Sequence, residues 1–143
     1  MNEPRQLATP IISPWMTAVL WFVGGYNVLA GIGMLCFYHE GYKLLALEKP
    51  GLNLPIQLVG ILVGLFGVGY WMVAANPIKN RNILLLGFWS KALGSVLGVY
   101  YVCVGKLPPY FLAVLFFSDI GYLPAFYVIL RRLKGAAKLH TGG

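Results

Sequence analysis

Apolar residues along the chain fall into four long runs that are separated by short polar segments. The runs cover about residues 15–38, 54–75, 83–104 and 109–130. A helix needs about 20 predominantly apolar residues to cross the hydrocarbon core of a bilayer, and each run has about that length. We therefore predict an all-α integral membrane protein whose four spans pack as a four-helix bundle.

The segments between and outside the runs have the composition of turns and surface elements. Residues 1–14 carry three prolines, which break any long helix and predict an irregular lead-in. Within the long connection 39–54, residues 42–48 predict a short interfacial helix that a Pro-Gly pair ends. An Asn-Pro dipeptide predicts a tight turn at 76–82, and residues 131–143 form a basic tail.

Composition excludes several classes of protein. The 143 residues are 59% hydrophobic and 10% charged, which is too apolar for a soluble domain. The net charge is +7, yet no basic stripe interleaved with aromatics lies on a polar scaffold, so we expect no nucleic-acid partner. The cysteines and histidines are too dispersed to predict a metal site. A disulfide between Cys36 and Cys103 stays open as an alternative, and small buried thiols are the preferred interpretation.

The distribution of basic residues predicts the orientation in the membrane. Seven Lys and Arg residues fall on the side of the lead-in, the turn 76–82 and the tail, whereas three fall on the opposite side. The positive-inside rule then places both termini in the cytoplasm. Four of the seven form a patch that we expect to contact anionic lipid headgroups: Arg131, Arg132, Lys134 and Lys138.

Two charged residues lie inside the last two apolar runs, where a lone charge costs roughly 2.5–3.5 kcal/mol. Lys91 lies about 15 residues before the centre of the turn at 105–109, and Asp119 lies about 12 residues after it. At ~1.5 Å per residue, these are depths of roughly 23 and 19 Å from one face. We therefore predict an ion pair in the middle of the bilayer, with Asn27 of the first run as a hydrogen-bonding neighbour. A structural clamp is the preferred role, and a proton or ion site is the alternative.

Glycines at helical spacings predict the faces on which the helices approach each other, because small residues allow close packing in lipid. These residues are Gly24, Gly31, Gly60, Gly64, Gly67, Gly87, Gly94 and Gly98. Lys91 shares a face with the last three, so its side chain should point into the bundle. Pro124 should free the carbonyl of Ile120 from its helical hydrogen bond and kink the fourth span beside Asp119.

Several short motifs lie between Tyr26 and Leu130: Tyr26-Asn27, Gly31, Gly69-Tyr70, Ala74-Ala75, Pro77, Gly87, Lys91-x-x-Gly94, Gly105-x-Leu107-Pro108, Asp119 and Pro124. Through them the chain resembles a family of small bacterial four-span membrane proteins of uncharacterised function. The resemblance implies that Asn27, Lys91 and Asp119 belong to the family pattern, and it supplies no activity. The four-helix plan is also similar to DoxX-like proteins, some of which are associated with quinone-linked oxidases.

These features lead to one preferred function and two alternatives. The chain has no soluble domain, no set of cofactor ligands and no nucleophile–base pair. We therefore expect a non-catalytic accessory subunit of a larger membrane complex, such as an energy-converting one, in the bacterial cytoplasmic (inner) membrane. Its partners would be membrane lipids and other membrane subunits, and any lipid, quinone or pigment would be held through those partners.

The first alternative is a small transporter of protons, ions or a solute that uses the intramembrane ion pair. A pair that is charged at neutral pH can pass protons only if an aqueous path reaches it. The second alternative is a DoxX-like quinone- or lipid-associated redox protein. In that protein the aromatic residues Trp89, Tyr100, Tyr101 and Tyr122 would line a flat ring-binding cleft, although aromatic residues also gather at membrane interfaces for other reasons.

Overall fold

The computed structural model describes residues 10–141, and it confirms the all-helical prediction: helices and turns, with no strand in this range. Four helical segments are long and apolar enough to cross a membrane. Three are continuous: α1 (Pro14–Cys36), α3 (Leu54–Ala75) and α4 (Arg81–Cys103). The fourth consists of α5 (Phe111–Ser118), the 3-10 turn η1 (Ile120–Tyr122) and α6 (Leu123–Thr141), and a short helix α2 (Tyr38–Leu44) follows α1.

Local sequence explains where several helices begin and end. Both α1 and α3 carry a proline in the first turn, where its missing N–H leaves no helical hydrogen bond unmade. After α3, Asn80 Nδ2 donates a 2.8 Å hydrogen bond to the carbonyl of Met72, which is one of the last carbonyls of the helix. The chain leaves α4 through Gly105 at φ +71°, a conformation that glycine adopts at little cost.

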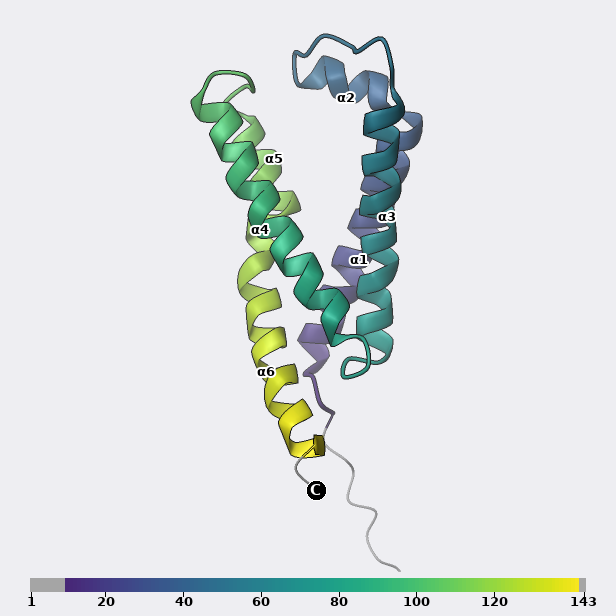
Figure 1. Cartoon of the computed structure of the whole chain (residues 1–143), viewed down its shortest axis with the longest axis vertical. Coiled ribbons are helices and arrows are strands. Elements are labelled where there is room, and N and C mark those ends of the chain that lie inside the picture. Colours follow the sequence, from purple (N-terminus) through teal and green to yellow (C-terminus); the bar gives the residue numbers. More distant parts are fainter. Residues whose placement is uncertain (1–9, 142–143) are drawn as a thin grey trace, which may run out of the picture.

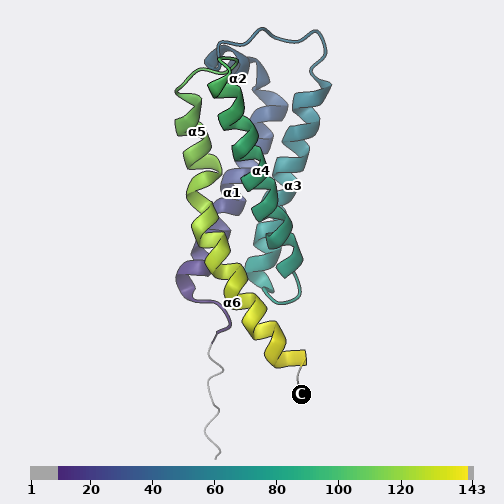
Figure 2. The same ribbon diagram turned by 60° about the vertical axis from the view of Figure 1, so that its left-hand side comes forward.

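The helices form two antiparallel pairs. α1 and α3 lie side by side along most of their length, and α4 lies beside α5 and α6 (Figure 1 and Figure 2). The two pairs meet near the end of the molecule that holds both described chain ends, and their ribbons diverge toward α2 (Figure 1). At the same end, α6 extends beyond the turn between α3 and α4 (Figure 1 and Figure 2).

The buried core lies where the two pairs meet. Tyr70 of α3 and Phe126 of α6 are fully enclosed, and their rings pack edge to face with centroids 5.0 Å apart. Leu20 of α1 and Leu84 of α4 are also completely buried, so every long helix contributes to the same cluster. The core therefore ties the two pairs together at one end.

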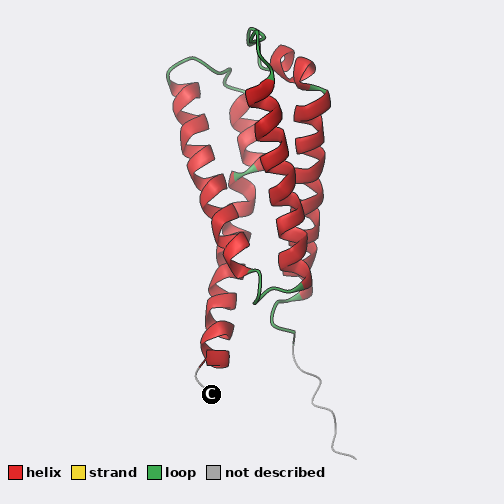
Figure 3. Ribbon diagram, turned by 45° about the vertical axis from the view of Figure 1, so that its right-hand side comes forward, coloured by secondary structure: helices red, strands yellow, loops and turns green. Residues whose placement is uncertain are grey.

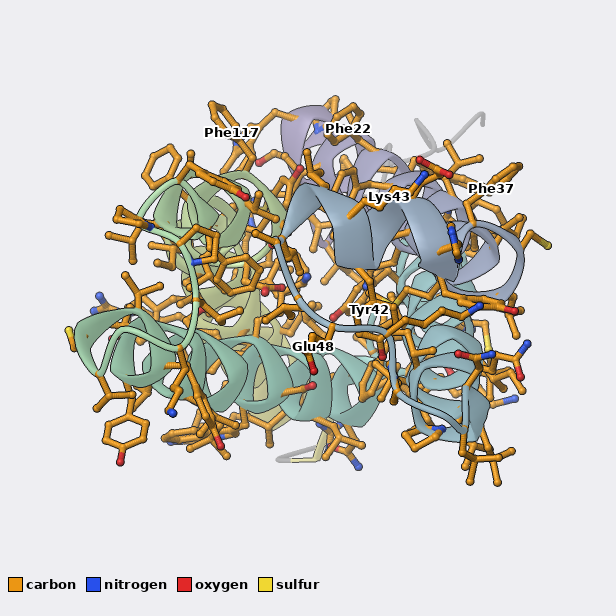
Figure 4. All side chains as sticks on the ribbon, turned by 90° about the horizontal axis from the view of Figure 1, so that it is seen from above. Phe22, Phe37, Tyr42, Lys43, Glu48 and Phe117 are labelled. Atoms are coloured by element: carbon orange, nitrogen blue, oxygen red, sulfur yellow. The ribbon has the colours of Figure 1, made fainter. Side chains whose placement is uncertain are left out.

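Most of the remaining large apolar side chains are exposed. Phe22, Phe37 and Phe117 are 65%, 65% and 69% exposed, and they lie at the outer edge when the molecule is viewed along its axis (Figure 4). A lipid-facing helix needs such a surface, because each spanning helix satisfies its own backbone hydrogen bonds and presents only side chains to lipid.

Glycines bring the backbones of α1 and α3 into direct contact. A Cβ atom added to Gly31 would lie 2.5 Å from the carbonyl oxygen of Gly60, and one added to Gly67 would lie 2.5 Å from that of Gly24. Such distances are closer than real Cβ atoms approach a carbonyl oxygen. These four predicted packing glycines are therefore required by the α1–α3 contact.

The buried face of α4 differs in part from the prediction. A Cβ at Gly87 or Gly98 would lie 2.5 or 2.7 Å from a side chain of a neighbouring helix, as expected for packing glycines. Gly94 is exposed, however, and a Cβ there would meet nothing within 4 Å. The inward position belongs to Ser95, which is 5% exposed. The reason is helical phase, since four residues from Lys91 turn closer to its face than three do.

The fourth span is interrupted instead of kinked. α5 ends at Ser118, Asp119 adopts the non-helical angles φ −132° and ψ −61°, and a new helix begins at Leu123 (Figure 3). Pro124 lies in the first turn of that helix, where its missing N–H has no helical partner to lose. The carbonyl of Ile120, which we expected to be free, accepts the backbone N–H of Leu123.

Two boundaries also differ from the sequence-based expectation. The helix expected to end at 130 continues to Thr141, so the described part of the basic tail is helical. The short helix in the first connection covers Tyr38–Leu44, instead of 42–48, and the chain turns at Ala46, whose φ is +53°. The irregular lead-in was predicted for residues 1–14; Pro10 to Ser13 are non-helical, and residues 1–9 lie outside the described range.

Two alanine substitutions on α3 test the close α1–α3 packing. Gly67→Ala should lower the free energy of unfolding by about 1–3 kcal/mol, because the new methyl group overpacks the contact. Gly64→Ala, three residues away, is the matched control, because a Cβ there meets nothing within 4 Å. It should be neutral or stabilising by up to about 1 kcal/mol through helix propensity. Unfolding in mixed detergent micelles, followed by circular dichroism, measures both; equal effects would contradict this packing.

Candidate functional site: a buried lysine at an interrupted helix

Lys91 lies in the middle of α4 on its inward face. Its side chain is 7% exposed, so the ammonium group is removed from solvent. One turn later, the Ser95 hydroxyl donates a 2.7 Å hydrogen bond to the carbonyl oxygen of Lys91. This contact turns the Ser95 hydroxyl back onto its own helix, a common way to satisfy a buried hydroxyl.

Three oxygen atoms from two other segments surround the ammonium nitrogen. Lys91 Nζ donates to Asp119 Oδ1 and to the carbonyl oxygen of Ser118, both at 2.8 Å. A longer contact of 3.5 Å leads to Asn27 Oδ1 on α1. An ammonium group has three N–H donors, which equals the number of these oxygen atoms. The structure thus brings together the three residues predicted as the intramembrane polar cluster.

The interruption after α5 creates this set of acceptors. The last carbonyls of a helix have no intrahelical donor, and they form the negative end of the helix dipole. Ser118 is the last residue of α5, and its carbonyl is turned to the lysine together with the carboxylate of Asp119. The helix end and the carboxylate therefore act as one negative site for the buried cation.

The other side of the ammonium group is aromatic. The nitrogen lies 5.7 Å from the centroid of the Tyr122 ring, which is within the range of a cation–π contact. The Tyr122 ring packs in turn against Tyr26 and Phe22 of α1, with centroids 6.3 and 6.4 Å apart. The lysine is therefore enclosed by one charged, one carbonyl, one amide and one aromatic group.

This geometry favours a clamp. Lys91 joins α4 to α1 through Asn27 and to the interrupted fourth span through Ser118 and Asp119. Asp119 is more accessible than its partner, at 27% exposed. Its second oxygen, Oδ2, accepts a 3.3 Å hydrogen bond from the Ser118 hydroxyl. The cation is thus fully coordinated within the fold, while the anion keeps limited access to its surroundings.

Sequence reasoning missed two contributors to this site. The carbonyl of Ser118 could not be assigned, because a continuous helix was expected there and its carbonyls would have been occupied. Ser95 was passed over in favour of Gly94. The signal for the Ser118 carbonyl was Pro124. Proline is as typical of the first turn of a new helix as it is of a kink within one.

Other predicted features are not gathered here. Cys36 and Cys103 are free thiols, and both are exposed, so neither the disulfide nor the buried thiols are found. Trp89 lines a groove between α4 and α6, whereas Tyr122 lies at the lysine and Tyr100 packs on its neighbour Tyr101, so these aromatics do not form one ring-binding cleft. Within the described residues, no group of three or more His, Cys, Asp or Glu side chains is placed to hold a metal ion.

Removing one member of the ion pair should destabilise the protein by about 3–5 kcal/mol, because the other charge stays buried without compensation. Asp119→Ala should lie at the upper end of this range, since Lys91 is the more deeply buried partner. Lys91→Met should lie at the lower end. The double variant should recover most of the loss. Unfolding in mixed micelles measures the series, with Lys79→Met as an exposed-lysine control. If the double variant lost as much stability as the two single variants together, the result would contradict a coupled pair.

Comparisons with known proteins add no assignment to this site. No family model, no curated protein and no solved structure matches the chain. The resemblance to bacterial four-span proteins and to DoxX-like proteins therefore stays a prediction. A function has to be proposed from the geometry of the described residues.

Proposed function

We propose that the chain is a non-catalytic accessory subunit of a larger membrane complex. One observation carries the proposal: three oxygen atoms of the fold surround the buried Lys91 ammonium group, two at 2.8 Å and one at 3.5 Å. A cation in this state stabilises helix packing and offers no free donor to a substrate or proton path. The ion pair then stabilises the fold of the subunit itself, and the subunit contacts its partners through its outer surface.

The exposed helix surface supports this role. The buried core is a single cluster where the helix pairs meet, and most large apolar side chains outside it are exposed. Aromatic residues such as Phe116 and Phe117 are 54% and 69% exposed on α5. Such a surface contacts lipid in the isolated subunit and offers large rigid side chains to neighbouring helices in a complex.

The orientation in the membrane is part of the proposal. Both described chain ends lie at the same end of the molecule (Figure 1), and most of the basic residues belong to segments at this end. The positive-inside rule supports a cytoplasmic position for this end in a bacterial inner membrane. The α2 end would then face the opposite side.

Extraction in a mild detergent tests the accessory role. The tagged chain, expressed at its native level, should migrate in native gels within a larger assembly of defined composition. Tagging a partner identified by mass spectrometry should recover the chain in return. Because the ion pair is assigned to folding, a folded Lys91→Met/Asp119→Asn double variant should keep the same partners. Recovery of the chain alone under all mild conditions would contradict an accessory role.

A transporter is the second candidate, and the interruption of the fourth span favours it. Broken spanning helices whose carbonyls point at a cation are typical of ion sites in secondary transporters. Here the lysine ammonium group occupies the position of such a cation, next to the partly exposed Asp119.

Reconstitution into liposomes tests this candidate. A transporter that uses the ion pair should move protons or monovalent cations down a gradient, and the double variant Lys91→Met/Asp119→Asn should lose that flux. Lys79→Met, which changes an exposed lysine outside the pair, should keep it. Flux that survives in a folded double variant would reject the transporter, and flux that is lost only in this variant would favour it over the accessory subunit.

A further inference from the structure

A groove of about 800 Å³ lies between the first part of α4 and the second part of α6, away from the buried lysine. α4 begins at the end of the molecule where α6 ends, so the two helices line the groove in opposite directions (Figure 1). The deepest lining residue is Leu133, which is fully buried. The groove is partly open, since several of its lining side chains are exposed.

The lining changes from basic to apolar along the groove. Arg81 at the start of α4 and Lys134 on α6 line its outer end, and Arg131 follows one turn further in. Trp89 of α4 and Tyr127 of α6 line its inner end, with exposed fractions of 54% and 57%. The eight residue steps from Arg81 to Trp89 span ~12 Å of helix. The headgroup region is roughly 5–7 Å thick on each side of a bilayer, so this length reaches from the headgroups into the acyl chains.

The charges of the groove have one sign. Its lining contains four basic residues and no acidic residue. Arg and Lys at such a position attract phosphate-bearing lipids, and a guanidinium group can bind two phosphate oxygens at once. Trp and Tyr are the side chains that favour the boundary between headgroups and acyl chains. The same groove therefore offers basic residues to a lipid headgroup and aromatic residues at the depth where the acyl chains begin.

We propose that this groove binds one anionic phospholipid, with its phosphate between Arg81 and Arg131 and an acyl chain along Leu85 and Trp89. A free phosphate ion would use only the basic end and leave the apolar floor unfilled. A zwitterionic lipid would fill the floor but bring no net negative charge to the arginines. The site requires no partner subunit and is independent of the accessory role.

The site differs from the general basic patch expected from the tail. Arg132, one residue from Arg131, does not line the groove; it donates a 3.0 Å hydrogen bond to Ser13 Oγ instead. Arg81, which the tail does not include, lines the groove from another helix. A bulk headgroup attraction would treat the three arginines alike, whereas a built site depends on Arg81 and Arg131.

Fluorescence quenching by lipids with brominated acyl chains tests the site in the full chain. The protein is placed in phosphatidylcholine vesicles that contain a small fraction of brominated phosphatidylglycerol or, in the parallel arm, brominated phosphatidylcholine. Phosphatidylglycerol should quench more strongly at equal fraction, and Trp89→Phe should remove the difference. Each of Arg81→Gln and Arg131→Gln should weaken the phosphatidylglycerol preference about fivefold. Inorganic phosphate and glycerol phosphate can occupy only the basic end, so they should not abolish the phosphatidylglycerol preference.

Two matched controls separate the groove from bulk charge. Arg132→Gln and Lys79→Gln remove the same charge from the same end of the protein without touching the groove, and both should keep the preference. Equal quenching by the two brominated lipids in the wild-type protein would overturn the proposal without any variant. Equal losses in Arg131→Gln, Arg132→Gln and Lys79→Gln would also overturn it, because bulk attraction would then be sufficient. If Arg81→Gln/Arg131→Gln does not fold, the charge-preserving Arg81→Lys/Arg131→Lys variant should weaken the preference, because lysine binds phosphate as a point charge and loses the two-oxygen contact; a preference kept in full would count against the site.

Discussion

The structure depends on a single buried cation. Lys91 lies about half-way along a spanning helix, where water is not available to solvate an ammonium group, and the protein replaces that water with three oxygen atoms. Each oxygen has a different origin: a carboxylate, a freed backbone carbonyl and an amide. Because they come from α1 and from the interrupted fourth span, satisfying one charge positions three parts of the chain at once. The helix interruption supplies one of these oxygens, since a continuous α5–α6 helix would keep the carbonyl of Ser118 in its own hydrogen bond.

The two helix pairs use different means of association. Between α1 and α3, glycines allow backbone contact, and the interface is long and closely packed, with a hydrogen bond from Trp71 Nε1 to the carbonyl of Trp21. Between the pairs, contact is concentrated in the aromatic core at one end and in the polar cluster near mid-depth. Lipid gives no hydrophobic gain for bringing apolar helices together. The polar cluster and the Tyr70–Phe126 contact are thus specific features of this arrangement, together with the hydrogen bonds from Arg132 to Ser13 and from Tyr110 to the carbonyl of Leu44.

The basic end and the polar cluster serve separate purposes. The cation of the cluster is buried and has its acceptors within the chain, whereas the groove between α4 and α6 is partly open and is lined by exposed side chains. Two neighbouring arginines illustrate this difference. Arg132 donates a hydrogen bond to Ser13, just before α1, whereas Arg131 lines the groove. An accessory subunit with this design would be held together internally by its ion pair and located in the bilayer by an anionic lipid at its basic end.

The sequence by itself determined the properties that depend on local composition. Apolar length predicted four spans, the charges at Lys91 and Asp119 predicted a meeting at similar depth, and Asn-Pro predicted the turn after α3.

Tertiary structure decided the features that depend on partners far along the chain. Ser95 replaced Gly94 on the buried face because small differences in helical phase matter only once a neighbour is in place. The fourth span breaks at Asp119, where a lysine on another helix donates to the freed carbonyl of Ser118, and Pro124 tolerates either a kink or a helix start. The groove arises only when Arg81 and Arg131, fifty residues apart, are placed on facing helices.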